Sequence, residues 1–346
     1  MEYNLLGTTD LKVSEVCLGT MTYGEQNTET EGHEQLNYAL GNGVNFIDTA
    51  EMYAVPGRKE TVHSTEKIIG TWLKDRKDRD QIILATKITG PSPNLTYIRD
   101  PLDFSPASIQ TALEGSLRRL QTDYIDLYQL HWPERKSNFF GNRSYKHDPS
   151  DEWEDNINEV LTAIQGHIKA GKIRHLGISN ETPYGVLRFL EESAVHGLPR
   201  IVSIQNPYNL LNRTFEVGLA EMAIKQKVGL LAYSPMAFGL LSGKYHLKTD
   251  RPEDRLNKFK QMSRYESDQC YQATEAYLGI AKDHGLTLAQ MSLAYTNTRP
   301  FLTSNIIGAT NMEQLKENIG SAAVKITPEI EAAIEKVQAV YPNPAT

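Results

Sequence analysis

The sequence predicts an α/β fold of the (β/α)8 TIM barrel type, in which eight parallel strands close into a ring and helices surround them. Short apolar and β-branched runs recur eight times along the chain, and amphipathic stretches with helical spacing separate them. Alternation of this kind is typical of parallel sheets, and eight strands are the number that closes such a barrel. The expected strands span residues 16–20, 45–49, 82–87, 124–131, 175–179, 202–205, 230–234 and 306–308.

Two shorter strands are expected before the barrel, within residues 3–15, around the turn sequence Gly7-Thr8-Thr9-Asp10. We expect this amino-terminal β-hairpin to close the end of the barrel opposite the active site. Among the connecting helices, the apolar spacing is clearest at residues 33–40, 108–120 and 156–169. The glycines that follow helices are expected to take a left-handed conformation, and they are Gly41, Gly171, Gly197 and Gly285.

Two long loops, at residues 133–153 and 236–265, interrupt the alternation. Loops of this length at the carboxyl ends of the strands are usually lids or binding walls. The first loop is rich in aromatic residues, which either form an apolar wall for the substrate or anchor the loop to the barrel. No internal repeat or linker-like tract divides the chain, so we expect one domain covering residues 1–346.

The composition excludes several classes of partner and site. The chain has 346 residues and a formal charge of −7 without a long run of one sign, so no nucleic-acid partner is expected. No apolar stretch is long enough to span a bilayer and no signal-peptide pattern opens the chain, which predicts a cytoplasmic protein without a membrane partner. The two cysteines, Cys17 and Cys270, are far apart, and no spaced cluster of ligand residues predicts a metal site.

Three polar residues, Asp48, Lys87 and His131, each stand where an apolar run of the expected barrel ends, and Tyr53 follows Asp48 in the next loop. Because the carboxyl ends of parallel strands open at the same mouth, we expect the four side chains to meet there. Each has an ordinary explanation when taken alone, such as a helix cap for Asp48 or a solvated edge charge for Lys87. Their recurrence at equivalent positions of successive strand-and-helix units favours a shared site.

The four groups have the chemistry of a proton-transfer site. A phenol has an unperturbed pKa of about 10, and a neighbouring ammonium group is expected to lower the pKa of Tyr53. Asp48 would keep Lys87 charged and in place, while the neutral imidazole of His131 would donate a hydrogen bond to a carbonyl oxygen. Such a site can protonate the alkoxide that forms when a hydride reaches a carbonyl carbon.

At these residues the chain resembles the aldo-keto reductase family. The segment from Asp48 to Tyr53, together with the strand-end Lys87 and His131, matches that family's catalytic tetrad, and further matching segments extend over nearly the whole chain. The resemblance implies an NADP(H)-dependent oxidoreductase that reduces a small-molecule aldehyde or ketone to an alcohol, with Tyr53 as the general acid. It implies NADPH as the cofactor, in preference to NADH.

The same resemblance implies which residues hold the cofactor. Ser179, Asn180 and Gln205 would hold the nicotinamide carboxamide, and Tyr233 would stack on the nicotinamide ring. The other residues implied to bind the cofactor are Gly19, Thr20, Met21, Asp48, Ser234, Pro235, Met236, Leu240, Ser242, Lys244, Arg255, Gly308, Thr310, Gln314, Glu317 and Asn318. Independently of the resemblance, no G-x-G-x-x-G motif follows a strand. In barrels, phosphates usually bind at the last loops and at the amino terminus of a helix.

One segment departs from the family pattern. The family often has a basic residue that binds the 2′-phosphate within the segment corresponding to residues 308–314, and this chain has none there. We therefore expect Thr310, Gln314 and backbone N–H groups to bind it. On the substrate side, Met52 and Trp132 are expected to line the pocket beside the tetrad.

Two other functions agree with parts of the sequence. Some relatives of this family bind NADPH tightly, turn it over slowly and serve a partner protein, so a regulatory or redox-sensing role is the main alternative. The second is a Schiff-base enzyme that uses Lys87 as a nucleophile, although a lysine paired with Asp48 would remain protonated and react poorly. No pattern in the sequence sets an oligomeric state.

Overall fold

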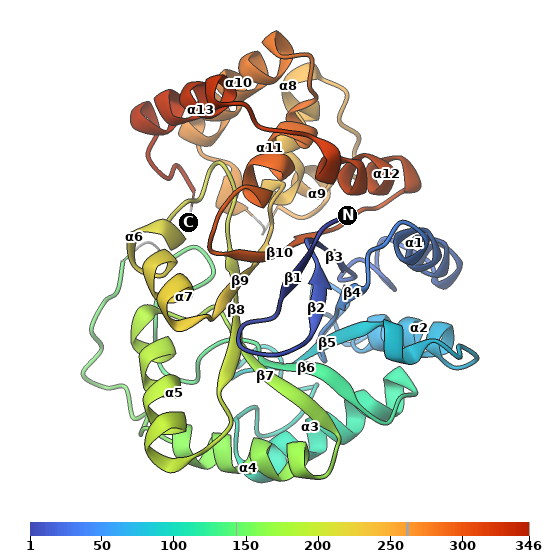
Figure 1. Cartoon of the computed structure of the whole chain (residues 1–346), viewed down its shortest axis with the longest axis vertical. Coiled ribbons are helices and arrows are strands. Elements are labelled where there is room, and N and C mark those ends of the chain that lie inside the picture. The colour runs from blue at the N-terminus through green and yellow to red at the C-terminus, as the bar shows by residue number, and fades with distance from the viewer. Residues whose placement is uncertain (143, 261–262, 346) are drawn as a thin grey trace.

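The chain folds around a closed barrel of eight parallel strands, whose neighbours follow the order β10-β3-β4-β5-β6-β7-β8-β9 (Figure 1). This computed structural model describes residues 1–142, 144–260 and 263–345. The barrel strands are β3 (Val16–Gly19), β4 (Phe46–Asp48), β5 (Ile83–Ile88), β6 (Ile125–Leu130), β7 (Ile173–Ser179), β8 (Ile201–Pro207), β9 (Gly229–Tyr233) and β10 (Leu302–Ile307). Each expected strand coincides with one of these, so the predicted barrel is confirmed.

The amino-terminal hairpin is also confirmed. β1 (Tyr3–Leu5) pairs antiparallel with β2 (Lys12–Ser14). Leu6 and Val13 are fully buried, and they join the apolar cluster inside the barrel that contains Phe46 at the start of β4. The hairpin thus fills the barrel from the amino ends of the strands and leaves the carboxyl ends open.

Helices connect successive strands and cover the outside of the barrel (Figure 1). The longer ones are α1 (Glu29–Gly41), α2 (Ser64–Leu73), α3 (Pro106–Leu120), α4 (Ile157–Lys169), α5 (Pro183–His196), α7 (Ala220–Gln226), α10 (Asp268–Asp283), α11 (Leu288–Asn297), α12 (Met312–Gly320) and α13 (Pro328–Val340). The shorter ones are η1 (Arg79–Gln81), α6 (Phe215–Gly218), η2 (Ala237–Ser242), α8 (Lys244–Leu247), α9 (Arg255–Lys258), η3 (Ser263–Tyr265) and η4 (Ser321–Ala323).

Side-chain caps explain where several of these helices begin. At α1, the Thr28 hydroxyl accepts a hydrogen bond from the backbone N–H of Glu31, whose carboxylate accepts one from the Thr28 backbone. Thr287 and Gln290 make the same reciprocal arrangement at α11. Because the first N–H groups of a helix have no partner inside it, each cap stabilises its helix by about 1 kcal/mol.

Three of the four expected left-handed glycines are confirmed, and one is wrong. Gly171, Gly197 and Gly285 have φ values of +72°, +62° and +68°. Gly41 instead remains the last residue of α1, and the left-handed turn falls two residues later at Gly43, with a φ of +83°. Between them Asn42 caps the helix with its backbone N–H, and its side chain donates to the carbonyl of Tyr38, so the helix runs further than expected.

The two long loops differ from each other. The described residues of the 133–153 segment contain no helix or strand, as expected. The 236–265 segment was expected to be a plain loop, but it contains η2, α8, α9 and η3. These turns are only three to six residues long, too short for a periodic apolar pattern to reveal them in the sequence. Residues 143, 261 and 262 belong to these two segments and lie outside the described residues.

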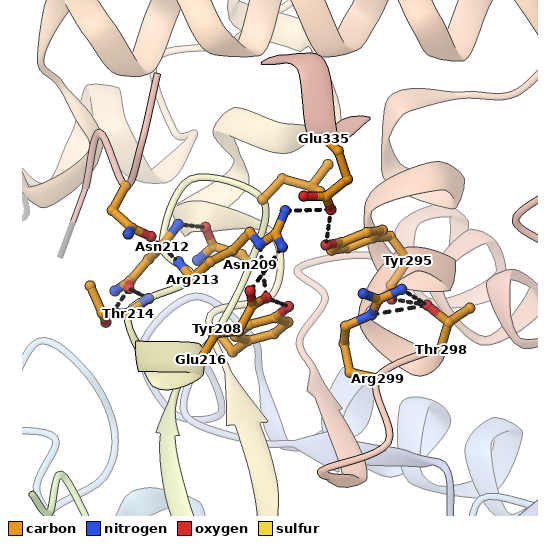
Figure 2. Close-up of polar contacts among 12 residues, drawn as sticks. Tyr208, Asn209, Asn212, Arg213, Thr214, Glu216, Tyr295, Thr298, Arg299 and Glu335 are labelled. Carbon is orange, nitrogen blue, oxygen red and sulfur yellow. Dashed lines mark hydrogen bonds and ion pairs between the residues drawn. The ribbon is translucent and has the colours of Figure 1, made fainter. Parts of the chain in front are cut away.

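A polar cluster joins the carboxyl end of β8 to the helices at the end of the chain (Figure 2). The guanidinium of Arg213 donates to both carboxylate oxygens of Glu216, at 2.8 Å each, and to Glu335 of α13 at 2.7 Å. The hydroxyl of Tyr208 donates to Glu216, and that of Tyr295 in α11 donates to Glu335. The charge of Arg213 is therefore fully compensated, and the cluster fixes the connection that follows β8.

Two searches of the described residues gave negative results. No helix there is long and apolar enough to cross a membrane. No three histidine, cysteine, aspartate or glutamate side chains in the described part of the chain come together in a group that would hold a metal ion.

The packing of α2 on α3 provides a test of the fold. A Cβ atom added at Gly70 in α2 would lie 2.0 Å from the backbone oxygen of Arg119, so Gly70→Ala must push the two helices apart. We expect this variant to lose about 1–3 kcal/mol of unfolding free energy in urea denaturation. The matched control is Gly166→Ala in α4, where nothing lies within 4 Å. It should gain about 0.5–1 kcal/mol, since alanine favours a helix interior. Equal effects of the two substitutions would contradict this packing.

Candidate active site

The polar site continues the barrel core along the same faces of the strands. Side chains two apart on a strand face the same side of the sheet. On β4, β5 and β6 the residues that follow the apolar core positions Phe46, Ala85 and Leu127 at this spacing are Asp48, Lys87 and Gln129. The strand register places Asp48 beside Ala85 and Lys87 beside Gln129. A polar layer therefore lies directly above the apolar layers of the barrel.

The centre of this layer is a buried ion pair. The ammonium of Lys87 donates to Asp48 Oδ2 at 2.6 Å and to the carbonyl oxygen of Thr49 at 2.8 Å. The other carboxylate oxygen, Asp48 Oδ1, accepts from the side-chain amides of Gln129 at 3.1 Å and Gln205 at 2.9 Å. The side chain of Lys87 is 0% exposed and that of Asp48 only 3%. Both charges thus have all of their main partners inside the protein.

The ion pair keeps Lys87 protonated. Burial by itself lowers the pKa of Lys87, but the charge of Asp48 and the neighbouring Tyr53 outweigh it, so the pKa is raised above its usual value. A protonated amine has no lone pair with which to attack a carbonyl. This geometry argues against the Schiff-base alternative.

Tyr53 lies beside the ammonium, in the connection after β4. Lys87 Nζ is 4.9 Å from the centre of the Tyr53 ring, and the Tyr53 side chain is only partly buried. Burial raises the pKa of the phenol, and Lys87 and Arg255 oppose this increase without cancelling it. Lys87 thus acts on the Tyr53 pKa in the expected direction, but the net shift is upward, because desolvation of the phenolate outweighs its attraction to the ammonium. Tyr53 keeps its proton at neutral pH.

His131 completes the group at the end of β6. Its ring packs edge-to-face against Tyr53, with 5.7 Å between the ring centres. Burial, and to a smaller extent the charge of Lys87, hold the pKa of His131 well below its usual value, so the imidazole is neutral. Its Nδ1 atom is buried without a hydrogen-bond partner. The structure thus brings all four expected residues together at one mouth of the barrel.

Two residues of this group were missed in the sequence. Gln129 stands two residues before His131 on the same face of β6, a position that the strand period could have revealed. Glu51 fixes the connection that carries Tyr53: its carboxylate accepts from the backbone N–H of Thr89 at 2.8 Å and lies 3.6 Å from Arg99. No local sequence signal marks this contact, because its partners lie almost forty residues away or more.

The residues expected to hold the nicotinamide adjoin the tetrad. The Tyr233 hydroxyl donates to Asn180 Oδ1 at 2.7 Å, and Asn180 Nδ2 donates to the carbonyl oxygen of His131 at 2.9 Å. The Ser179 hydroxyl donates to the carbonyl oxygen of Gln205 at 2.7 Å. In this state their side chains satisfy one another, so a ligand must compete with these hydrogen bonds.

The cations in the segment after β9 differ in whether they have an acidic partner. Ser234 is left-handed with a φ of +53°, and Pro235 and Met236 follow it toward η2. Lys244 forms an ion pair with Asp254, so its charge is already compensated. Arg255 has no acidic partner among the described residues, and burial lowers its pKa to about 10. Two further expected cofactor residues take structural roles here: Leu240 is fully buried, and the Ser242 hydroxyl donates to the Gly239 carbonyl.

The segment after β10 forms an open cradle. A Cβ atom built at Gly308 would meet nothing closer than the Gly19 carbonyl oxygen at 4.0 Å. The backbone N–H of Thr310 donates to Gln314 Oε1 at 3.0 Å, and Asn318 Nδ2 donates to the Gly308 carbonyl at 3.0 Å. Open space therefore lies at Gly308, four residues before α12 begins, while side chains of the segment occupy the N–H groups of Thr310 and Gln314.

Other expected cofactor residues make contacts within the protein that fix neighbouring segments. Thr20 is fully buried and its hydroxyl donates to the Asp48 carbonyl at 2.8 Å. The Met21 carbonyl accepts from the backbone N–H of Val55 at 2.9 Å. Glu317 accepts a hydrogen bond from Thr287, which caps α11.

Aromatic side chains continue outward from the tetrad. The ring of Trp132 lies 4.8 Å from that of His131, and Phe140 of the 133–153 segment packs edge-to-face on Trp132 at 5.6 Å. One hollow lies beside Trp132, and a larger one lies between Phe140 and α6. Neither hollow is lined by any of the four tetrad residues.

Comparison with known proteins gives matches along almost the whole chain. The model of a family described as the aldo/keto reductase family matches residues 15–339. "Protein tas" of Escherichia coli (strain K12) is 47% identical, over 100% of both chains. "Uncharacterized oxidoreductase YrpG" of Bacillus subtilis is 32% identical over 99% of this chain and 97% of that protein. "Aldo-keto reductase" of Babesia bovis is 37% identical over 76% of this chain and 98% of that protein.

The buried ion pair can be tested by a double-mutant cycle on Asp48 and Lys87. Asp48→Asn keeps an oxygen for Gln129 and Gln205 but removes the charge, and Lys87→Met removes the ammonium at similar volume. Each single variant should lose about 3–5 kcal/mol of unfolding free energy, because one buried charge is left without its partner. The double variant should lose less than the sum by at least about 1 kcal/mol, as measured by urea denaturation.

The control for this cycle is Lys172→Met, which removes one member of a solvent-exposed pair with Glu114. It should leave the unfolding free energy nearly unchanged. Strictly additive losses in the double variant would mean that the two charges do not stabilise each other.

Proposed function

The chain belongs to the aldo/keto reductase family, and from that premise we propose that it is an NADPH-dependent reductase of aldehydes or ketones. Membership of the family makes it an oxidoreductase of the kind that uses a nicotinamide cofactor. The observation that carries the finer proposal is the arrangement of Tyr53 and His131 beside the buried pair of Lys87 and Asp48. A proton donor, a fixed cation and a neutral hydrogen-bond donor are what carbonyl reduction requires.

In the proposed reaction the carbonyl carbon gains a hydride and the carbonyl oxygen gains a proton, which together give the alcohol. The cofactor, when bound, supplies the hydride. Tyr53 holds the proton at neutral pH, because burial raises the pKa of its phenol. It transfers that proton from its hydroxyl oxygen to the substrate oxygen, and the partly exposed phenol then recovers a proton from water.

The other three residues act on the charges that this transfer creates. Lys87 remains an ammonium throughout and stabilises the phenolate of Tyr53 as it forms. Asp48 holds Lys87 in place through the contact of 2.6 Å. The neutral imidazole of His131 has one N–H, which donates to the carbonyl oxygen and orients it toward Tyr53.

The chain's residues fit a nicotinamide dinucleotide across the barrel mouth. Asn180 and Ser179 carry amide and hydroxyl groups next to the tetrad, where a carboxamide would replace their mutual hydrogen bonds. At the other side, the open space at Gly308 and the amino terminus of α12 suit a phosphate group. Arg255, a half-buried cation without an acidic partner, supports a further phosphate contact.

Removing the proton donor should stop turnover without loosening the cofactor. We expect Tyr53→Phe to lower kcat by about 10²–10⁴-fold, the usual contribution of a general acid. The dissociation constant for NADPH, measured by fluorescence titration, should stay within about twofold. The matched control is Tyr3→Phe in the hairpin at the opposite end of the barrel, where the hydroxyl contacts only the Gly43 carbonyl. Wild-type turnover in Tyr53→Phe would show that another group supplies the proton.

The choice of cofactor is tested by calorimetric titration of the purified protein with NADPH and, separately, with NADH. We expect NADPH to bind at least about tenfold more tightly, because its 2′-phosphate adds charge and acceptor oxygens that Thr310, Gln314 and backbone N–H groups can bind. Equal affinities for NADPH and NADH would mean that residues 308–314 do not recognise the 2′-phosphate. Tight NADPH binding without turnover of any aldehyde in a short aromatic and aliphatic panel would favour the regulatory alternative.

A further inference from the structure

The larger of the two hollows, the one next to α6, has a lining without net charge. It is lined by residues 138–142, by residues 180–183 and by parts of 206–219. Among the described residues that line it, Glu181 alone is charged, and Arg135 donates to its two carboxylate oxygens at 2.7 and 2.6 Å. Because an ion without a partner is costly to bury, this lining favours a neutral ligand.

Aromatic and amide groups connect this hollow to the tetrad. The ring of Phe140, which lines the hollow, packs edge-to-face on Trp132, and the ring of Trp132 lies 4.8 Å from that of His131. Phe139, also in the lining, packs edge-to-face on Phe140 at 5.1 Å. Asn180 lines the hollow as well, and its side-chain amide donates to the carbonyl oxygen of His131. A ligand that begins at the tetrad can therefore extend along these residues into the hollow.

One buried amide of the lining has an unsatisfied donor. The side chain of Asn206 is fully paired, since its Oδ1 accepts from the backbone N–H of Glu181 and its Nδ2 donates to the Glu181 carbonyl. In Asn212, Oδ1 accepts from the backbone N–H and the hydroxyl of Thr214 (Figure 2). Because a backbone N–H can only donate, this contact fixes which amide atom is the oxygen. The Nδ2 of Asn212 is buried and has no hydrogen-bond partner among the described residues.

The unpaired donor is held in a rigid turn. Asn212 and Asn209 exchange two backbone hydrogen bonds of 3.0 Å, and Asn212 is only 1% exposed. The next residue, Arg213, is fixed by Glu216 and Glu335 (Figure 2). A donor that cannot turn away to another partner remains unpaired until a ligand supplies an acceptor, and such donors discriminate strongly between ligands.

We propose that this hollow is a subsite for the end of the substrate that lies away from the reacting carbonyl. The substrate class is an extended carbonyl compound whose far end is neutral and carries an acceptor oxygen, such as that of an amide, ester or ether. Asn212 Nδ2 donates to this oxygen and so determines specificity without touching the reacting atoms. The inference rests on the proposed function, because it takes the occupant of the hollow to be the substrate of the reductase.

The test removes the donor in two ways that keep the turn. Asn212→Asp retains the oxygen that accepts from Thr214, and Asn212→Ser supplies a hydroxyl oxygen for the same contact without adding a charge. The substrates are para-substituted benzaldehydes that end in an acetamide group, on linkers of none to three methylene groups. Each is paired with the analogue in which an isobutyl group of the same shape replaces the acetamide, and kcat/KM is measured for both.

We expect the acetamide-to-isobutyl ratio of kcat/KM to fall at least about threefold in both variants at one or more linker lengths, since one neutral hydrogen bond is lost. The change should appear as a higher KM for the acetamide substrate, with kcat for the isobutyl substrate unchanged, because the reacting groups are not altered. A ratio that stays at its wild-type value in both variants at every length would mean that Asn212 Nδ2 does not bind the substrate, and the subsite would be wrong.

The matched control is Asn297→Asp at the end of α11. Its Oδ1 accepts from Asn305 and its Nδ2 is likewise buried without a partner among the described residues, but it lines neither hollow. This variant should leave the ratio unchanged. An equal fall in Asn297→Asp and in the Asn212 variants would contradict the subsite, because the loss would then follow from a general change in the protein.

A second measurement uses the wild-type protein and needs neither folding of the variants nor turnover. N-benzylacetamide, a neutral aromatic amide that the enzyme cannot reduce in this way, is titrated into ¹⁵N-labelled protein. We expect the side-chain amide signal of Asn212 to shift progressively while that of Asn297 stays in place. No shift at Asn212 would overturn the subsite. If the wild-type protein reduces none of the benzaldehydes, the reductase proposal fails, and this titration still decides whether the hollow binds such a group.

Discussion

The candidate site depends on one buried ion pair, that of Asp48 with Lys87. Moving a carboxylate and an ammonium out of water costs several kcal/mol for each ion, and their attraction offsets this only when the remaining hydrogen-bonding atoms are also satisfied. Here Thr49, Gln129 and Gln205 supply those partners. Gln129 and Gln205 come from β6 and β8, which are distant in sequence from β4 and β5, so the pair is stable only when the barrel is closed and in register.

The form of Tyr53 depends on the balance between this ion pair and burial. An ammonium beside a phenol favours the phenolate, whereas burial favours the neutral phenol. Burial is the larger influence in this structure, so the pKa is raised and the proton stays on the oxygen. This balance suits a proton donor in the direction of carbonyl reduction. Once the proton has left, the ammonium of Lys87 stabilises the phenolate of Tyr53.

Lys244, Arg255 and Arg264 of the 236–265 segment differ in how their charges are balanced. Lys244 is neutralised by Asp254 within the segment. Arg255 and Arg264 lie beside aromatic rings and phenol hydroxyls, and neither forms an ion pair among the described residues. The same contrast holds for Arg213, whose charge is fully matched by two glutamates in the cluster behind β8 (Figure 2). Pairing with acidic neighbours thus ties a cation into the fold, as it does for Lys244 and Arg213.

The sequence by itself determined the barrel and the residues that meet at its mouth. Eight apolar runs, the helical spacing between them and polar residues at strand ends are local patterns, and the closed parallel sheet is the arrangement that satisfies them all. The amino-terminal hairpin followed from its turn residues in the same way. The short turns within residues 236–265 and the end of α1 at Gly41 were not predicted, because elements of one turn and helix ends have too few residues to show a period.

Only the tertiary structure decided how the charges are balanced. Whether Lys244 or Arg264 has an acidic partner depends on which side chains the folded loop brings within a few ångströms. The direction of the Tyr53 pKa depends on how much water the surrounding segments exclude. Burial and long-range pairing arise from contacts between residues far apart in the chain, so a local sequence pattern cannot predict them.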